Sequence, residues 1–127
     1  MDSEAVSSLE SDLQQLTPDF CEAVLYGNDH KLKEVFDKGF PVNFPILGGT
    51  ALHNLAGTRA RPAIRLLLTY EDVNFISRDN KGRLPSEMAY LYGHDPALAR
   101  LLGIKERKQA EEQGIKLTRR PPPEAKP

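Results

Sequence analysis

The sequence has little of what several classes of function require. It has one cysteine, Cys21, which cannot form an internal disulfide, so we expect a reducing compartment. A net charge of −1 gives no overall attraction to nucleic acid or to an anionic membrane. The chain starts without a basic segment followed by an apolar run, and no apolar run approaches the length of a membrane span. We therefore expect a single-domain, soluble, cytoplasmic protein.

The charges that are present are unevenly distributed. Residues 1–22 contain six acidic side chains and no basic one, whereas residues 103–127 contain seven basic and four acidic side chains. Arg59, Arg61 and Arg65 add positive charge in the middle of the chain. The two ends are therefore predicted to present electrostatically different surfaces.

Three segments of the chain align with a period close to 33 residues. Apolar residues recur at 32, 35 and 36, at 64, 67 and 68, and at 98, 101 and 102. Apolar residues at i, i+3 and i+4 lie on one face of a helix. Each segment is therefore predicted to form two short antiparallel helices followed by an extended hairpin.

Residues that start and end helices occur at matching places in these segments. Thr17-Pro18 and Asp95-Pro96 are typical of a helix start, with a capping side chain followed by proline at the first helical position. Gly27 and Gly93 stand where a first helix should end, since glycine adopts a left-handed conformation at low cost.

Two runs identify the repeated unit. The middle segment reads GTALHNLA at 49–56, with LLL at 66–68 and DVN at 72–74, and the last reads GRLPSEMAYLYGH at 82–94. They resemble ankyrin repeats, in about three units at 17–48, 49–81 and 82–103. The resemblance implies an all-α solenoid of stacked helix-turn-helix units joined by hairpin loops. The chain departs from the family pattern at Asp19 and Cys21 in the first unit, at Arg59 in the second, and at Leu84 and Glu87 in the third.

Segments outside the repeats have their own patterns. Residues 1–16 are predicted to form an amphipathic capping helix, with partner binding as the alternative, because Val6, Leu9, Leu13 and Leu16 recur at helical spacing. Residues 104–117 are predicted to be a charged helical extension with little apolar surface to bury, stopped by Gly114. Residues 118–127 are proline-rich and are predicted to be extended or disordered.

The stretch FPILGGTALHNLA at 44–56 raises the question of chemistry. A phosphate loop would need a lysine beside Gly48-Gly49-Thr50, and there is none. No recognisable nucleophile or carboxylate motif accompanies His53, so an enzyme using His53 is the less favoured alternative. The resemblance implies instead that Thr50 and His53 form a hydrogen-bonded network that ties neighbouring hairpins together.

The remaining candidate ligands are also interpreted as structural. Cys21, His30, His53 and His94 are scattered without a closely spaced pair, so we expect no metal and no cofactor. Asn43 and Asn74 each follow a valine, and the resemblance implies that their side chains order the hairpins by bonding to the backbone.

Recognition of another protein is the function that the resemblance implies. Its concave surface would consist of the hairpin tips and the exposed side of the first helices. The positions that map there are Phe44, Ile46, Leu47, Arg78, Asn80, Lys81, Arg83, Leu91 and Tyr92. Phe75 repeats the Val-Asn-Phe pattern, which favours an inward position for Phe44, whereas inward and exposed positions stay open for Ile46 and Leu47.

We therefore expect a non-catalytic interaction module, acting as an inhibitor, adaptor or assembly factor on a protein with an acidic surface. A toxin-immunity protein or a host-directed effector fits the same observations. The chain would act as a monomer or in a heterocomplex. The alternative is a homo-oligomer in which the acidic N-terminal helix docks on the basic surface of a neighbour.

Overall fold

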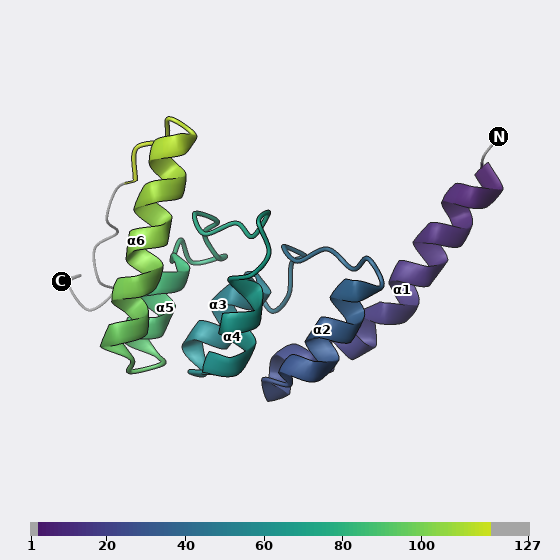
Figure 1. Cartoon of the computed structure of the whole chain (residues 1–127), viewed down its shortest axis with the longest axis horizontal. Helices are drawn as coiled ribbons and strands as arrows, with labels where there is room; N and C mark the ends of the chain where they lie inside the picture. The colour runs from purple at the N-terminus through teal and green to yellow at the C-terminus, as the bar shows by residue number, and fades with distance from the viewer. Residues whose placement is uncertain (1–2, 118–127) are drawn as a thin grey trace.

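The computed structural model describes residues 3–117, with side chains from residue 14 onward. Within this part the chain is all-α and contains no strand. Its helices are α1 (Ser3–Tyr26), α2 (Asp29–Asp37), α3 (Ala51–Gly57), α4 (Arg61–Leu67), α5 (Pro85–Leu91) and α6 (Pro96–Glu112). Figure 1 shows them as a row with α1 at one end and α6 at the other.

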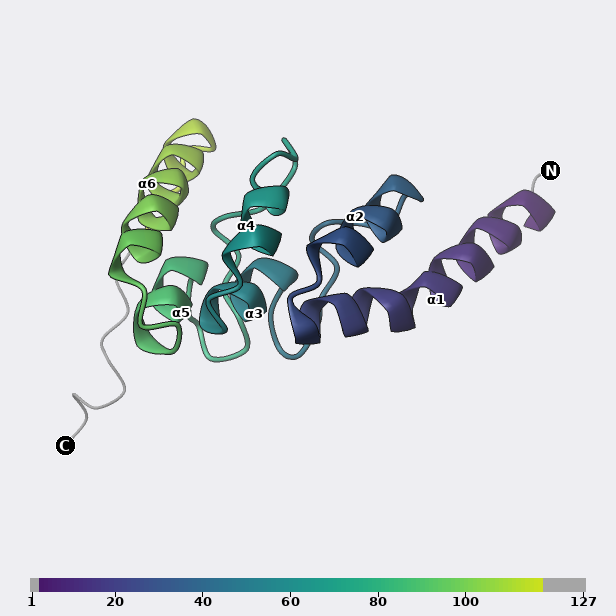
Figure 2. The same ribbon diagram turned by 60° about the horizontal axis from the view of Figure 1, so that its bottom comes forward.

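The helices pack in consecutive pairs. α1 packs on α2, α3 on α4, and α5 on α6, while α3 also contacts α1 and α5, and α2 contacts α4. Figure 2 shows two layers, with α2, α4 and α6 in one and α3, α5 and the second half of α1 in the other. Long connections at 38–50 and 68–84 join one pair to the next.

Helix α1 joins two helices that the sequence analysis predicts as separate. It runs through Thr17 and Pro18 without a break, so the predicted helix start at Thr17-Pro18 is wrong. Proline removes its own N–H from the helical ladder and its ring crowds the carbonyl four residues earlier, and a long helix accommodates both with a bend. Figure 2 shows the axis of α1 changing direction partway along. The end at Gly27 is confirmed, because Gly27 has a φ of 63° and α1 ends at Tyr26.

The core lies between the helix pairs. Of the apolar positions that define the repeats, most are buried, and Leu32, Ile64, Leu67 and Leu102 are each at most 1% exposed. Burial of such a side chain contributes about 1.5–3 kcal/mol. Leu68 and Leu101 differ, since Leu68 is half-buried and Leu101 is 41% exposed.

Helix α6 buries more of its C-terminal half than the sequence predicts. It runs as one helix from Pro96 to Glu112, and both Glu106 and Ala110 are 3% exposed. Gln109 accepts a hydrogen bond from the Phe75 N–H and donates to the Val73 carbonyl. Ala110 is the one buried apolar residue of 104–117, so the unexpected burial is that of polar side chains on α6, which hold the preceding loop. The predicted stop at Gly114 is confirmed, with a φ of 68°.

The end of α5 has a different cause from the one predicted. The left-handed residue is His94, with a φ of 49°, and Gly93 does not have a positive φ. A Cβ atom on Gly93 would lie 2.4 Å from the Ala56 carbonyl oxygen on α3. Glycine is needed here because α3 approaches the backbone of α5 closely. The proline-rich tail at 118–127 lies outside the described residues.

Candidate interaction surface

A tight turn at Ile46–Gly49 forms the tip of the loop before α3. The Ile46 N–H donates to the Gly49 carbonyl over 2.9 Å, and the Gly49 N–H donates back over 3.0 Å. The two central residues, Leu47 and Gly48, have φ values of 51° and 83°. Turns with two left-handed central residues favour glycine, asparagine and aspartate, so a leucine at the first position is unusual.

The turn geometry sends its apolar residues in different directions. Ile46 is 7% exposed and Leu47 is 65% exposed. Phe44 packs inward, with its ring centroid 4.9 Å from that of Phe40 and 5.9 Å from that of Phe20. Ile46 is therefore corrected from a candidate contact residue to a core residue, and Phe44 to a half-buried residue packed against the core. Leu47 alone of the three points into solvent.

His53 and Thr50 join this loop to the next one. The Thr50 N–H donates to His53 Nδ1 over 3.1 Å, and the Thr50 hydroxyl caps α3 by accepting from the His53 N–H. His53 Nε2 lies 2.9 Å from the Arg83 carbonyl oxygen, which can only accept, so this nitrogen carries the proton. One imidazole thus connects the start of α3 with the loop before α5.

The environment of His53 is unsuited to a catalytic base. Its side chain is 1% exposed, and burial lowers its pKa. Both ring nitrogens are within hydrogen-bond distance of partners in the chain. Both nitrogens are therefore engaged within the chain, as expected of a bridging histidine.

The loop at 77–84 is organised around Asp79. Its carboxylate accepts from the backbone N–H groups of Lys81 and Arg83, at 3.0 and 2.8 Å, and from Arg83 Nε at 2.9 Å. Arg83 Nη1 donates to the Tyr92 hydroxyl over 2.8 Å, and its guanidinium lies 5.0 Å from the Tyr92 ring centroid. Tyr92 is 54% exposed and is held in place by Arg83.

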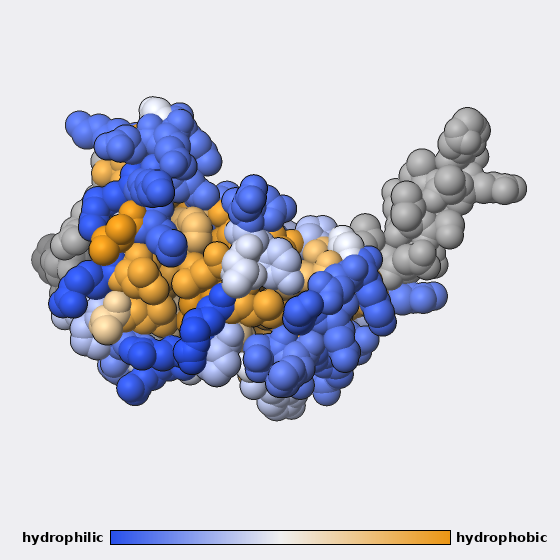
Figure 3. Space-filling model, in the orientation of Figure 1, coloured by the Kyte–Doolittle hydropathy of each residue, from blue (hydrophilic) through white to orange (hydrophobic). Residues whose placement is uncertain are grey.

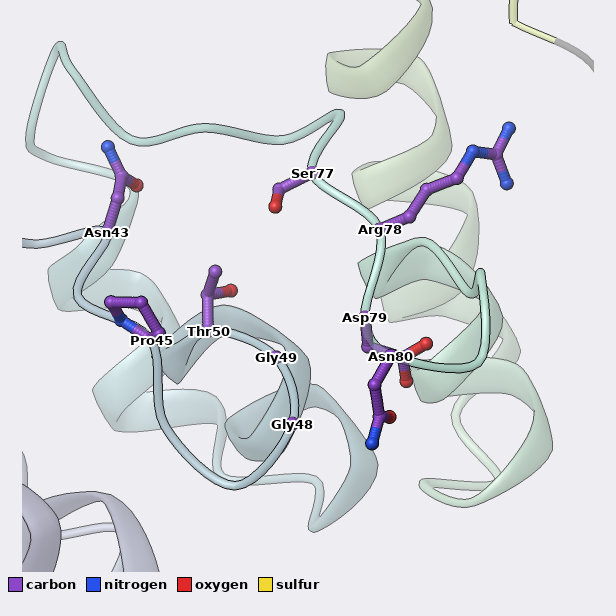
Figure 4. A pocket seen from close by; sticks show the side chains of 9 residues that line it. All are labelled: Asn43, Pro45, Gly48, Gly49, Thr50, Ser77, Arg78, Asp79 and Asn80. Atoms are coloured by element: carbon purple, nitrogen blue, oxygen red, sulfur yellow. The ribbon is translucent and has the colours of Figure 1, made fainter.

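Backbone contacts bring the two loops together. The Asn80 N–H donates to the Gly48 carbonyl over 2.7 Å, which places Asn80 and Lys81 beside the Leu47 turn. Arg78 donates to the Gly82 carbonyl. A shallow cavity of about 350 Å³ lies between the loops, and Figure 4 shows the side chains that line it. Leu91 is half-buried at the end of α5 and is a weaker candidate than Leu47 or Tyr92.

Asn43 and Asn74 order the two long loops, 38–50 and 68–84, that join one helix pair to the next. The Asn43 amide donates to the Asp72 carbonyl over 2.7 Å, and its oxygen accepts from the Asn74 N–H over 2.9 Å. The Asn74 side chain accepts from the Ile76 N–H over 3.0 Å. Both asparagines thus bond to backbone groups of the loop at 68–84.

The sequence analysis did not predict the partners of two buried carboxylates near the third helix pair, Asp95 and Glu106. Asp95 caps α6 by accepting from the Leu98 N–H and forms a two-point ion pair with Arg61, at 2.8 and 2.6 Å. The Arg61 guanidinium lowers the pKa of Asp95 to about 2. Burial raises the pKa of Glu106 to about 6, although the Ser86 N–H and hydroxyl both donate to it.

The described part of the chain contains neither a cluster of metal-ligating side chains nor a helix suited to span a membrane. No cluster of three or more histidine, cysteine, aspartate or glutamate side chains there could hold a metal ion. No helix there is long and apolar enough to cross a bilayer.

No protein-family model matches the chain, and a search of curated proteins found no match either. Function has to be inferred from the contacts described above.

Proposed function

We propose that the chain is an ankyrin-type solenoid that acts as a non-catalytic protein-protein interaction module. The 33-residue period, the three helix pairs and the Thr50–His53 bridge to Arg83 support this proposal. A row of packed pairs presents loop tips in fixed positions. Fixed positions lower the ordering cost of binding.

The exposed side chain of Leu47 is the observation that carries the proposal. An apolar side chain that is 65% exposed adds little to folding. Its left-handed backbone costs roughly 1–2 kcal/mol compared with a residue in an ordinary conformation. Because neither property stabilises the folded chain, we interpret Leu47 as an anchor for a partner.

The neighbours of Leu47 indicate the chemistry of that partner. Lys81 is exposed in the loop that the Asn80 N–H ties to Gly48, and Tyr92 presents an exposed ring held by Arg83. Apolar and aromatic anchors beside basic side chains favour a protein surface with an apolar pocket and acidic residues around it.

Replacement of Leu47 by glycine tests this surface without damaging the fold. Glycine accepts a φ of 51° freely, so Leu47→Gly should leave the melting temperature unchanged or slightly higher. A photocrosslinking amino acid at position 47 identifies the partner in the native cell, and calorimetry with that purified partner then measures affinity. We expect a loss of at least about tenfold, as for an interface hot spot.

The matched control is Leu25→Ser, which removes a leucine that is 58% exposed on α1. This variant should bind with the affinity of the unmodified chain. Equal affinities of the Leu47→Gly variant and the unmodified chain would refute the assignment. Ile46 is left unchanged, because it is buried and its replacement would lower stability.

A further inference from the structure

A groove between α4 and α6 has no role in the proposed function. Its volume is about 250 Å³, and its lining consists of Arg61, Ile64, Arg65, Leu68, Ala97, Leu98 and Leu101. The α4 residues recur at i, i+3, i+4 and i+7, which is one continuous helical face. Because α4 approaches α6 less closely than it approaches α2, this apolar face is only partly covered.

The incomplete cover leaves Leu101 more exposed than its counterpart in the previous repeat. Leu101 is 41% exposed, whereas Leu67, at the equivalent position of the previous unit, is 1% exposed. Figure 3 shows an apolar area between α4 and α6 with hydrophilic atoms along its borders. The groove therefore offers apolar surface that a helix could cover.

The charged residues that line this groove are basic. Arg61 and Arg65 lie in its wall, and Lys105 and Lys108 follow Leu101 at helical spacing along α6. The two acidic residues of segment 94–108 are each 3% exposed, since Asp95 is paired with Arg61 and Glu106 accepts from Ser86. A ligand for this groove should therefore be apolar on one side and acidic on the other.

One segment of the chain itself has that composition. Residues 3–16 contain Glu4, Glu10 and Asp12, no basic residue, and Val6, Leu9 and Leu13 at three- and four-residue spacing. Leu16 packs against the core of its own chain. The backbone of this segment is helical, and at 1.5 Å per residue it is roughly 20 Å long. Figure 1 shows it extending away from α2, at the opposite end of the molecule from α6. This segment cannot reach the groove of its own chain, but the same segment of a second copy can.

We propose that the α4–α6 groove of one copy binds the acidic N-terminal segment, residues 3–16, of a second copy. Acidic residues of the segment would lie beside Arg65 and Lys108, and its apolar residues would cover Leu68 and Leu101. This head-to-tail contact gives a closed pair when each copy fills the other's groove, and a longer chain when it does not. The contact is separate from the Leu47 surface and does not depend on it.

Light scattering on the full chain tests the proposal. From micromolar to about millimolar protein, the mass should rise above the 14.2 kDa of one chain, and added salt should reverse the rise. Arg65→Glu should raise the apparent dissociation constant at least about tenfold. Lys38→Glu, an equal change of charge at the exposed C-terminal end of α2, should leave it unchanged. Arg61 is retained because it holds Asp95.

Charge exchange gives the decisive result. A Glu10→Lys, Asp12→Lys variant and an Arg65→Glu, Lys108→Glu variant should each be monomeric, and an equimolar mixture should associate again. Circular dichroism confirms that each variant is folded. The proposal is overturned by a monomer at every concentration, by equal effects of Arg65→Glu and Lys38→Glu, or by a mixture of folded variants that stays monomeric. The Leu47→Gly variant should associate like the unmodified chain, which separates this contact from partner binding.

Discussion

The junction between the first and second helix pairs differs in chemistry from the junction between the second and third. At the first, the Phe36 ring meets Tyr70 at 5.3 Å, and Phe44 packs on Phe20 and Phe40. The hydrogen bonds from Asn43 to the loop at 68–84 are exposed. This junction depends mainly on apolar area, which places few demands on direction.

The second junction depends on directed polar contacts and on close backbone approach. His53 reaches the Arg83 carbonyl, Arg61 pairs with Asp95, and Gly93 lies against the Ala56 carbonyl. Buried polar groups are stable only when they are satisfied, and no buried side-chain nitrogen or oxygen among the described residues lacks a partner. The comparison teaches that similar helix pairs can be joined by different forces, and that the polar junction should be less tolerant of substitution and more sensitive to pH.

The largest expected difference between the junctions comes from adding one methyl group at each. Gly93→Ala would place Cβ 2.4 Å from the Ala56 carbonyl oxygen, so α3 and α5 must move apart, at a cost of about 3 kcal/mol or more. Gly27→Ala meets only the Ala60 Cβ at 3.1 Å, and its cost comes from a φ of 63°, about 1–2 kcal/mol. Urea unfolding of the full chain measures both, and similar losses would remove the distinction.

A smaller difference is expected from the bridging side chains. His53→Gln should lower the free energy of unfolding by about 1–3 kcal/mol, because the Thr50 N–H or the Arg83 carbonyl loses a buried partner. Asn43→Ala at the first junction should cost less, about 0.5–1.5 kcal/mol, because water can replace exposed hydrogen bonds. Thermal melting ranks the two variants. An unchanged melting temperature for His53→Gln would refute a structural role for this histidine.

The sequence predicts the parts of this structure that depend on local pattern. The apolar faces of α2, α4 and α6 follow from the spacing of Leu32, Ile64 and Leu98, and the helix end at Gly27 and the cap at Asp95 follow from residue type. The continuity of α1 through Pro18 was missed because one proline signals either a start or a bend, and only tertiary packing decides between them.

Long-range pairings could not be predicted from local pattern. Nothing near Ser86 in sequence indicates that Glu106 accepts from it, and nothing near Asp95 indicates Arg61 as its partner. The opposite directions of Ile46 and Leu47 depend on a turn with two left-handed residues, which the sequence Leu47-Gly48 does not suggest. The exposed candidate Leu47 was therefore identified together with Ile46, which belongs to the core, and Phe44, which is half-buried against it.

A further predicted effect depends on pH and follows from the two buried carboxylates near the third helix pair. The pKa of Glu106 is raised to about 6, above the ordinary value of 4.5, so folding favours its protonated form. Its ionisation therefore lowers stability as pH rises from about 4.5 through 6, by about 2 kcal/mol for a shift of this size. Asp95 changes stability with pH in the opposite direction. Its pKa is lowered from 3.8 to about 2, so its contribution to stability is present above pH 3.8 and is lost as pH falls through 2.

Glu106→Gln removes the pH dependence of stability that comes from Glu106 and leaves the one that comes from Asp95. Between pH 4 and 7 the free energy of unfolding of the variant should rise by about 2 kcal/mol relative to that of the unmodified chain. The contributions of Asp95 and His53 cancel in this difference, because both residues are present in both proteins. Urea unfolding at each pH measures it, with Glu111→Gln, at an exposed position of α6, as the control that should give no such rise. A constant difference across this range would mean that burial of Glu106 carries no pH-dependent cost.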